Sequence, residues 1–276
     1  MIDRPVDFLI IGAAKCATTW LQNSLQNDPA IFMPDAELHF FSREYDRGLD
    51  WYTNHFTPKD DSVVLGEKSN SYLTEEAAAQ RIKDIYPDAR LILQMRNPIA
   101  RAYSDYCMLY RRGAVSGDIE KHLDPDVAAD QRFIHNGRYG HHMTRFLELF
   151  PAEQFLFLFF ENVKVAPETQ LAQVAEHIGF DGTLSPPLGK KVKDRRAAMV
   201  PRPLRAAIKP LRPLLDPLRN TAPMKSLRNM VAKPVVYPPI TPQLVEKLDT
   251  YFRPDVKLLE EIMGKDLGDW MDNPGL

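Results

Sequence analysis

The fold is decided by the stretch Asp7 to Leu25, which reads DFLIIGAAKCATTWLQNSL. It begins with a short apolar run that Gly12 ends, a pattern typical of a strand buried on both faces of a sheet. From Thr18 onward the apolar side chains recur at helical spacing, and the hydroxyls of Thr18 and Thr19 can cap that helix. The pattern predicts a strand, a tight loop and a helix.

The loop between this strand and this helix carries one charge, that of Lys15. The N-terminus of a helix exposes unpaired N–H groups and the positive end of the helix dipole. A lysine and two hydroxyls at that point make a cradle for phosphate. The Walker pattern is absent, because Lys15 comes too early and the loop contains no Gly-Lys pair. An ordinary strand–turn–helix with a solvated lysine is the alternative.

The composition is that of an ordinary globular protein. The chain has 276 residues, of which 44% are hydrophobic and 26% charged, and we expect one domain over residues 1–276. The net charge of −2 does not indicate a particular binding partner, and we expect no nucleic acid to bind. Cys16 and Cys107 cannot form a disulfide framework, and neither a signal peptide nor a spanning segment is visible. We therefore expect a reduced, cytoplasmic protein.

Apolar runs alternate with amphipathic segments along the chain. Strands are predicted at residues 31–33, 63–66, 91–95 and 155–160. Helices are predicted at residues 74–86, 98–112, 141–150, 167–178 and 255–263, with another that begins at Pro242. Residues 113–137 read as loop. Strands that alternate with helices indicate an α/β protein, here a three-layer α/β/α fold with a central parallel sheet and a P-loop-like nucleotide site.

Polar residues stand where the predicted strands end. Lys68 follows the strand at 63–66, and Arg96 closes the strand at 91–95. Asn97 then caps the next helix, in which Ser104 lies two turns from the start. Ligands of parallel sheets bind outside the carboxyl ends of the strands. Arg96 and Ser104 together can therefore hold a second phosphate.

Histidines occur in two informative places. If residues 34–41 are extended, the side chains of Glu37 and His39 point to the same side and can do acid–base work. A polar surface turn is the alternative reading of that segment. The pair His141-His142 is interpreted as polar surface, because adjacent helical positions diverge and no further ligand is near in sequence. No metal site is expected.

A basic, proline-rich segment covers residues 183–240. Residues 186–242 hold 12 of the 23 prolines, which forbid a long regular helix. Residues 189–233 hold 13 Lys and Arg and two acidic residues, for a net charge near +11. This segment is predicted to cover a polyanionic ligand or to touch an anionic membrane surface. A solvated connector is the alternative.

A resemblance to a known family rests on four motifs, which occur in this order: GAAKCATTW, AELHFF, EKSNSYL and RNPIARAYSDY. The chain resembles the sulfotransferases that use 3′-phosphoadenosine-5′-phosphosulfate (PAPS), nearest the glycan and bacterial branch. The resemblance extends to GRYGHHMTRFLELFP and LDTYFRPDVKLLEEIMGKDLGDW, and leaves out residues 113–135 and 183–240. It implies transfer of the sulfuryl group to a hydroxyl, or less often an amine, of a carbohydrate, lipid or small metabolite. Adenosine 3′,5′-bisphosphate is the implied second product.

The resemblance assigns the donor-binding residues. Lys15, Thr18 and Thr19 match the loop that the family uses for the 5′-phosphosulfate. Arg96 and Ser104 match its 3′-phosphate pair at the same separation. The donor-binding set expected on this basis also includes Cys16, Ala17, Trp20, Arg195 and Arg196.

The resemblance also assigns the catalytic residues. Glu37 matches the carboxylate that glycan sulfotransferases use as base, and Lys68 matches a lysine near the transferring group. Lys15 and Lys68 would stabilise the leaving phosphate. His39 either orients Glu37 or acts as the base itself, and the family match favours Glu37.

The chain departs from the family pattern in two places. Cys16-Ala17 stands where Lys-x-Gly-Thr-Thr is commoner, so Ala17 is expected to avoid a positive φ. The loop that closes over the 3′-phosphate has no clear match, and Lys193, Arg195 and Arg196 are placed to substitute for it.

Two other functions compete with sulfuryl transfer. A nucleotide kinase or related phosphotransferase would need the Gly-Lys-Ser/Thr sequence and a strand-end Asp of the Walker B type, neither of which is evident. A non-catalytic nucleotide-binding module would have no need of Glu37, Lys15 and Lys68 together. The sequence specifies neither the acceptor nor the oligomeric state.

Overall fold

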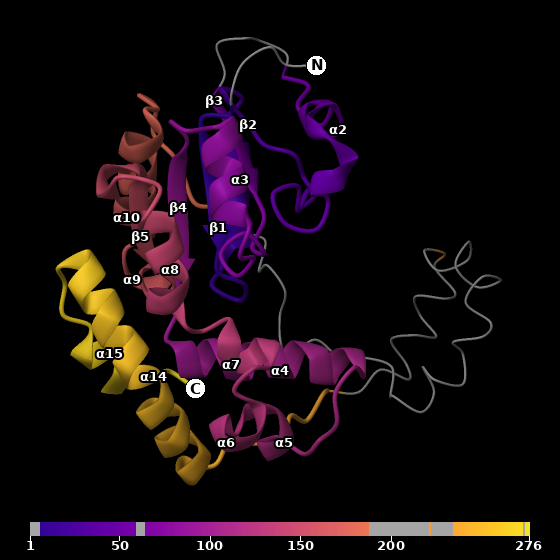
Figure 1. Ribbon diagram of the computed structural model, residues 1–276, viewed down its shortest axis with the longest axis vertical. Coiled ribbons are helices and arrows are strands. Elements are labelled where there is room, and N and C mark those ends of the chain that lie inside the picture. Colours follow the sequence, from indigo (N-terminus) through magenta and orange to yellow (C-terminus); the bar gives the residue numbers. More distant parts are fainter. Residues whose placement is uncertain (1–5, 59–63, 188–220, 222–233, 273) are drawn as a thin grey trace.

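The structure, a computed structural model, describes residues 6–58, 64–187, 221, 234–272 and 274–276. Lys193, Arg195 and Arg196, with the whole basic stretch 189–220 and 222–233, lie outside the described residues. The described strands form one parallel sheet, as predicted, and their order is β2-β3-β1-β4-β5 (Figure 1). Their bounds are β1 Phe8–Gly12, β2 Ile31–Phe32, β3 Val64–Lys68, β4 Arg90–Met95 and β5 Phe155–Phe159.

The central strand β1 is buried along its whole length, which explains why its sequence is apolar without alternation. Phe8 pairs with Gly66 of β3 on one side and with Arg90 of β4 on the other. A Cβ on Gly66 would lie 2.0 Å from the ring of Phe8, so this position needs glycine. The first β–loop–α unit thus stands in the middle of the sheet.

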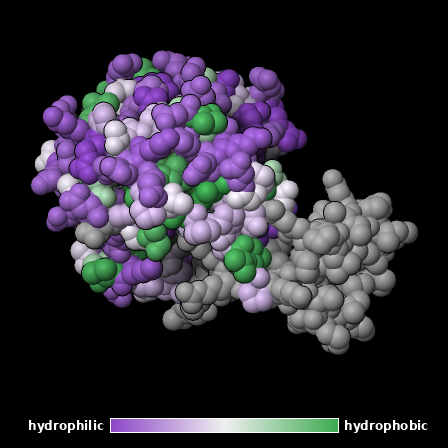
Figure 2. All heavy atoms as spheres, turned by 90° about the horizontal axis from the view of Figure 1, so that it is seen from below, coloured by the Kyte–Doolittle hydropathy of each residue, from purple (hydrophilic) through white to green (hydrophobic). Residues whose placement is uncertain are grey.

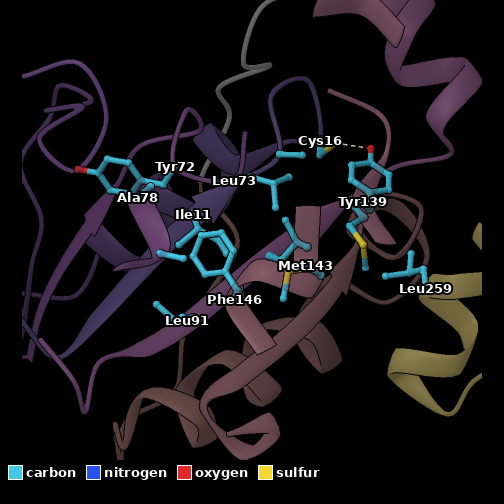
Figure 3. Packing of buried hydrophobic residues seen from close by; sticks show 14 of the residues in the cluster. Ile11, Cys16, Tyr72, Leu73, Ala78, Leu91, Tyr139, Met143, Phe146 and Leu259 are labelled. Carbon is cyan, nitrogen blue, oxygen red and sulfur yellow. Dashed lines mark hydrogen bonds between the residues drawn. The ribbon is translucent and has the colours of Figure 1, made fainter. Parts of the chain in front are cut away.

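Helices cover both faces of the sheet, which makes the predicted three layers. On one face pack α1 (Thr18–Gln26) and α10 (Pro167–Ile178). On the other pack α3 (Ala78–Ile85) and α8 (Tyr139–Leu147), whose Met143 and Phe146 meet Ile11 and Leu91 of the sheet (Figure 3). Burial of these two apolar faces is the main stabilisation of the fold.

The carboxyl end of the sheet is closed by α4 (Pro98–Arg112), which Figure 1 shows below the strands with α7 beside it. Asn97 caps α4 as predicted, because its side chain accepts from the N–H groups of Ile99 and Ala100. The remaining short elements are η1 Tyr45–Arg47, α2 Leu49–Thr53, η2 Ala152–Gln154 and α9 Asn162–Val165.

Three sequence predictions about helices were wrong in detail. The segment 113–137, expected to be loop, contains one-turn helices α5 (Glu120–Leu123), α6 (Pro125–Ala128) and α7 (Arg132–His135), which are too short to show a periodic pattern. The helix expected from residue 74 begins only at Ala78. The two helices expected after Pro242 are one, α14 (Pro242–Met263), which passes through Pro254.

The described surface carries its large hydrophobic side chains singly. On the face shown in Figure 2, they lie scattered among hydrophilic residues. The most exposed come from separate segments of the chain: Leu49, Val127, Val165, Val236 and Leu276. Within the described ranges, no helix is both long and apolar enough to cross a membrane.

Candidate active site

The loop after β1 takes a shape that the sequence did not predict. Lys15 has φ 75° and Ala17 has φ 65°, so the expectation that Ala17 avoids a positive φ was wrong. An alanine in the left-handed region costs about 1 kcal/mol. Cys16 lies between these two residues and is fully buried.

Thr18 does not cap α1, contrary to the sequence prediction. The N-cap is Ala17, and no side chain accepts a hydrogen bond there. Thr18 begins the helix instead, and its hydroxyl donates to Oδ1 of Asn70 at 2.8 Å. Because no side chain caps the helix, the N–H groups of its first turn suit an anion. Thr19 and Trp20 follow on the half-exposed side of the same turn.

Lys15 contacts α4, the helix that carries Ser104 of the second predicted phosphate site. Lys15 Nζ lies 3.6 Å from Sδ of Met108 on α4. Arg96, almost buried, places its guanidinium 4.4 Å from the centre of the Phe160 ring. Ser104 is nearly buried two turns into α4. Arg96 directly follows β4, and Ser104 lies on α4 one turn before Met108, the residue that Lys15 contacts.

The buried hydroxyl of Tyr139 connects the two segments that were predicted to bind phosphate. It lies 3.5 Å from Sγ of Cys16 (Figure 3). It also donates to the carbonyl oxygen of Arg96 at 2.9 Å. The Tyr139 ring stacks on Trp270 of α15 (Gly268–Asp272). The carbonyl of Trp270 in turn accepts from Nδ2 of Asn97 at 2.6 Å. Sequence reasoning missed all four contacts, because partners so far apart in the chain leave no local pattern.

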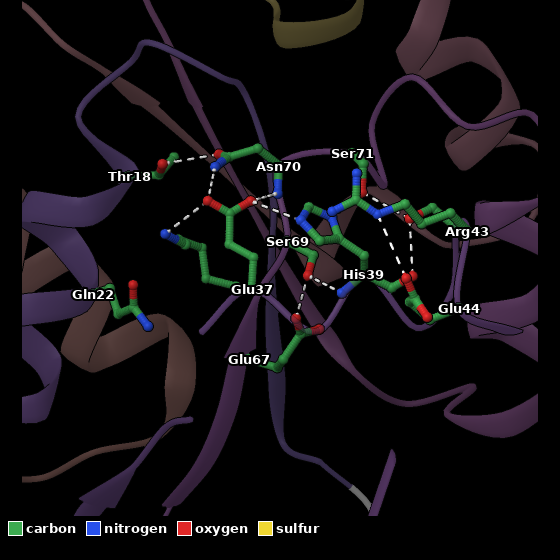
Figure 4. A network of polar contacts seen from close by, with 12 residues as sticks. Thr18, Gln22, Glu37, His39, Arg43, Glu44, Glu67, Ser69, Asn70 and Ser71 are labelled. Atoms are coloured by element: carbon green, nitrogen blue, oxygen red, sulfur yellow. Dashed lines mark hydrogen bonds and ion pairs between the residues drawn. The ribbon is translucent and has the colours of Figure 1, made fainter. Parts of the chain in front are cut away.

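Glu37 and His39 lie beside each other, as the sequence predicted, and Figure 4 shows their contact. Lys68 contacts the same carboxylate. Lys68 Nζ lies 3.1 Å from Oε1 of Glu37, and the lysine side chain is only 4% exposed. The imidazole of His39 lies 3.8 Å from the other carboxylate oxygen, Oε2. Asn70 donates to both oxygens, from its backbone N at 3.1 Å and from Nδ2 at 2.9 Å. Four groups therefore surround one carboxylate.

The backbone of the segment 34–41 differs from the extended conformation that was considered in the sequence analysis. His39 has φ 54°, so the segment turns there and is not extended. The turn is held by Ser69, whose hydroxyl accepts from the backbone N–H of His39 at 2.8 Å. Nδ1 of the imidazole lies 2.7 Å from the hydroxyl of Ser71. Side chains of EKSNSYL thus place His39, a role visible only once β3 and the segment 34–41 are side by side.

The charges around Glu37 decide its ionisation. Burial opposes the charged form, but the ammonium of Lys68 and the N–H of Asn70 outweigh it and hold the pKa of Glu37 below its usual value. Burial and the nearby Arg43 lower the pKa of His39. At neutral pH the site therefore holds a carboxylate next to a neutral imidazole.

A second carboxyl group lies beneath the site. Glu67 is fully buried on β3, and Ser69 donates a hydrogen bond to its Oε1. Burial raises the pKa of Glu67 to about 7. The hydroxyl of Ser69 therefore links this buried group to the backbone of His39.

The histidines of α8 lie apart from this site. His142 is fully buried, and the prediction that it belongs to the polar surface was wrong. Its Nε2 lies 2.9 Å from the carbonyl oxygen of His135, and burial lowers its pKa to about 3. In the part of the chain that the structure describes, no group of three or more His, Cys, Asp and Glu could hold a metal ion.

Comparisons with known proteins agree with this geometry. Residues 57–183 match the sulfotransferase family. Heparan sulfate glucosamine 3-O-sulfotransferase 6 of Mus musculus is 27% identical over 264 residues, which cover 94% of this chain and 72% of that protein. Heparan sulfate glucosamine 3-O-sulfotransferase 3B1 of Homo sapiens is 32% identical over 177 residues, 62% of this chain and 45% of that protein.

A solved structure extends the similarity over the whole fold. The crystal structure of a sulfotransferase from Alicyclobacillus acidocaldarius has a TM-score of 0.71 and 25% identity, and the match covers 98% of this chain and 99% of that one. The sequence match and the fold match agree with each other. The site agrees with both, because Glu37, Lys68 and Lys15 all lie at the carboxyl end of the sheet. Over most of its length, the chain is thus similar in sequence and in fold to enzymes of the sulfotransferase family.

Proposed function

We propose that the protein transfers the sulfuryl group of PAPS to a hydroxyl group of a carbohydrate-type acceptor. The observation that carries the proposal is the position of Glu37. Its carboxylate is hydrogen-bonded through Asn70 to Thr18 at the start of α1, next to the loop that suits the donor's phosphosulfate. Proton acceptor and donor cradle are thus one connected unit.

The residues present fit such a donor. The uncapped first turn of α1 and the ammonium of Lys15 suit the 5′-phosphosulfate. Arg96 and Ser104 suit a 3′-phosphate, since a guanidinium and a hydroxyl both donate to phosphate oxygens. When bound, PAPS supplies the sulfuryl group and departs as adenosine 3′,5′-bisphosphate.

Glu37 Oε2 is the atom that takes the proton of the acceptor hydroxyl. Oε1 already accepts from Lys68 and from Nδ2 of Asn70, whereas Oε2 accepts, among the described residues, only the backbone N–H of Asn70 at hydrogen-bond distance. A carboxylate oxygen has two lone-pair positions, so Oε2 has room for one more proton. General-base action of this kind contributes about 10²- to 10⁴-fold in rate.

Lys68 and Lys15 supply positive charge for the leaving group. Lys68 is buried beside Glu37, where its charge acts in a medium of lower dielectric than water. Positioning and charge neutralisation are the main contributions in the related phosphoryl transfers. The kinase and non-catalytic alternatives are not favoured, because the relatives and the fold match are sulfotransferases. The cytoplasmic location and the single domain over residues 1–276 stay predictions.

Labelled PAPS tests the proposal directly. The protein is incubated with sulfur-labelled donor and a panel of oligosaccharides, glycolipids and small hydroxylated metabolites, and products are identified by mass spectrometry. We expect sulfate ester on at least one carbohydrate and none with the Lys15→Ala variant. Transfer of phosphate from ATP with magnesium, and none of sulfate from PAPS, would replace the proposal with the kinase alternative.

A further inference from the structure

Asn70 is the residue through which the donor loop and the carboxylate of Glu37 touch. Its Oδ1 accepts from the hydroxyl of Thr18 at 2.8 Å, and its Nδ2 donates to Oε1 of Glu37 at 2.9 Å. Its backbone N donates to Oε2 at 3.1 Å. Figure 4 shows Asn70 between Thr18 and Glu37, with all three contacts drawn.

The two N–H groups of Asn70 form a clamp that fixes the orientation of the Glu37 carboxylate. Two N–H groups of one residue reach two different oxygens of Glu37, so the plane of the carboxylate cannot rotate without losing one of them. The amide orientation is also determined, because a flipped Asn70 would present its oxygen to Glu37 and its NH2 to the hydroxyl of Thr18. Only the observed orientation lets both neighbours pair.

We propose that Asn70 is a positioning residue for sulfuryl transfer. It holds the carboxylate of Glu37 at a fixed distance from the start of α1, where the donor binds. This inference rests on the proposed function. Asn70 does not itself take the proton, since an amide nitrogen that donates to a carboxylate is no base. Its contribution is the fixed distance between the proton acceptor and the donor cradle, and errors of about 1 Å in such distances cost up to about 100-fold in rate.

The pKa of Glu37 provides a measurement that is separate from turnover, because it depends on the groups around the carboxylate. Lys68 faces it from β3, His39 from its own segment, and the buried Glu67 lies below. The charge of Lys68 and the backbone N–H of Asn70 lower the pKa of Glu37. Nδ2 of Asn70 donates to Oε1 and stabilises the ionised form in the same way. Loss of the Asn70 side chain removes one donor from Oε1 and leaves the backbone N–H in place, so the pKa of Glu37 should rise.

The test compares Asn70→Ala and Asn70→Asp with Asn54→Ala, a control at an exposed amide outside the site. The side-chain carboxyl of Glu37 is titrated by ¹³C NMR in labelled protein and assigned with Glu37→Gln. We expect a higher pKa of Glu37 in Asn70→Ala and a still higher one in Asn70→Asp, where a second carboxylate lies at the clamp. Asn54→Ala should titrate like the wild type.

Turnover and donor binding complete the test. With an acceptor from the screen, kcat should fall about 10- to 100-fold in Asn70→Ala, while binding of adenosine 3′,5′-bisphosphate changes much less. An unchanged Glu37 titration in both Asn70 variants, or a loss of nucleotide binding as large as the loss of kcat, would overturn the assignment. Failure of the wild type to bind the bisphosphate would instead contradict the proposed function, since the NMR titration needs no substrate.

Discussion

The hydroxyl of Tyr139 lies 3.5 Å from Sγ of Cys16, in the middle of the loop that follows β1. The same hydroxyl donates to the carbonyl of Arg96, so one buried atom touches both segments that suit the donor's phosphates. Tyr139 comes from α8, which contributes no residue to the predicted donor-binding set. The spacing between the two phosphate-binding segments is therefore set partly by a helix outside the site.

Tyr139→Phe tests this link. The variant keeps the ring and its stacking on Trp270 but leaves the Arg96 carbonyl without its donor, which should cost about 1–3 kcal/mol in the free energy of unfolding. Binding of adenosine 3′,5′-bisphosphate should weaken as well. Urea unfolding and calorimetry measure the two quantities, and Tyr251→Phe on α14 is the control. Equal effects of the two substitutions on nucleotide binding would show that the link is not needed.

Lys15→Ala should abolish transfer and leave the fold intact. Lys15 belongs to a loop and is only part-buried, so its loss removes charge from the donor cradle and little apolar burial from the core. Circular dichroism and a transfer assay check the two statements, with Lys257→Ala at an exposed position of α14 as the control. Near-normal turnover in a folded Lys15→Ala protein would remove Lys15 from the mechanism.

Glu37→Gln should lower kcat by about two orders of magnitude and keep nucleotide affinity nearly unchanged. Glutamine keeps the size of the side chain but cannot accept the proton. Steady-state kinetics and calorimetry measure both, and the exposed Asp35→Asn is the matched control. A far larger loss in His39→Ala than in Glu37→Gln would assign the proton to His39 instead.

The 3′-phosphate separates a sulfotransferase from a kinase in binding alone. Adenosine 3′,5′-bisphosphate should bind at least ~10-fold more tightly than AMP, since hydrogen bonds to charged groups contribute about 1.5–3 kcal/mol each. Arg96→Ala should remove most of this preference and leave AMP binding almost unchanged, whereas Arg112→Ala at the exposed end of α4 should keep it. Calorimetry supplies the affinities. A wild type that binds both nucleotides equally would argue against the assignment of Arg96.

Glu67 makes the stability of the protein depend on pH. Its pKa is about 7 in the folded protein, above its ordinary 4.5, because burial disfavours the charge. The folded state therefore holds this proton more tightly, and the stabilisation present below pH 4.5 is lost as the pH rises through about 7. The loss is about 3 kcal/mol, since one pKa unit corresponds to about 1.4 kcal/mol.

Glu67→Gln, which cannot ionise, should lack this component. The free energy of unfolding, measured with urea between pH 4 and 8, should fall less steeply with pH in the variant than in the wild type. Glu153→Gln at an exposed position is the control. Parallel curves for Glu67→Gln and the wild type would mean that Glu67 stays ionised in the folded protein.

The sequence predicted the parts of this protein that follow local rules. The buried strand Phe8–Gly12, the Asn97-Pro98 start of α4 and the Gly179 end of α10 each depend on near neighbours in the chain, and all three were confirmed. Glu37 and Lys68 were predicted from motifs, and the structure brings them to 3.1 Å.

The features that were missed depend on contacts between distant segments. Ala17 takes a positive φ because the loop must fit between β1 and α1, and the local preference of alanine gives way to that constraint. Thr18 donates to Asn70 instead of capping its own helix, since the end of β3 lies within reach. Asn70 itself stood inside a quoted motif, but no local rule marks an asparagine as the partner of a carboxylate 33 residues earlier.

The place of β1 in the sheet has a consequence for how the protein is made. β1 pairs with β3 and β4, whose residues Val64–Lys68 and Arg90–Met95 are synthesised later. At about 5–20 residues per second, the ribosome leaves this apolar strand without either neighbour for several seconds. During that interval Phe8–Gly12 is an extended hydrophobic segment of the kind that chaperones bind. The donor loop, although translated early, gains its shape only when the later strands arrive.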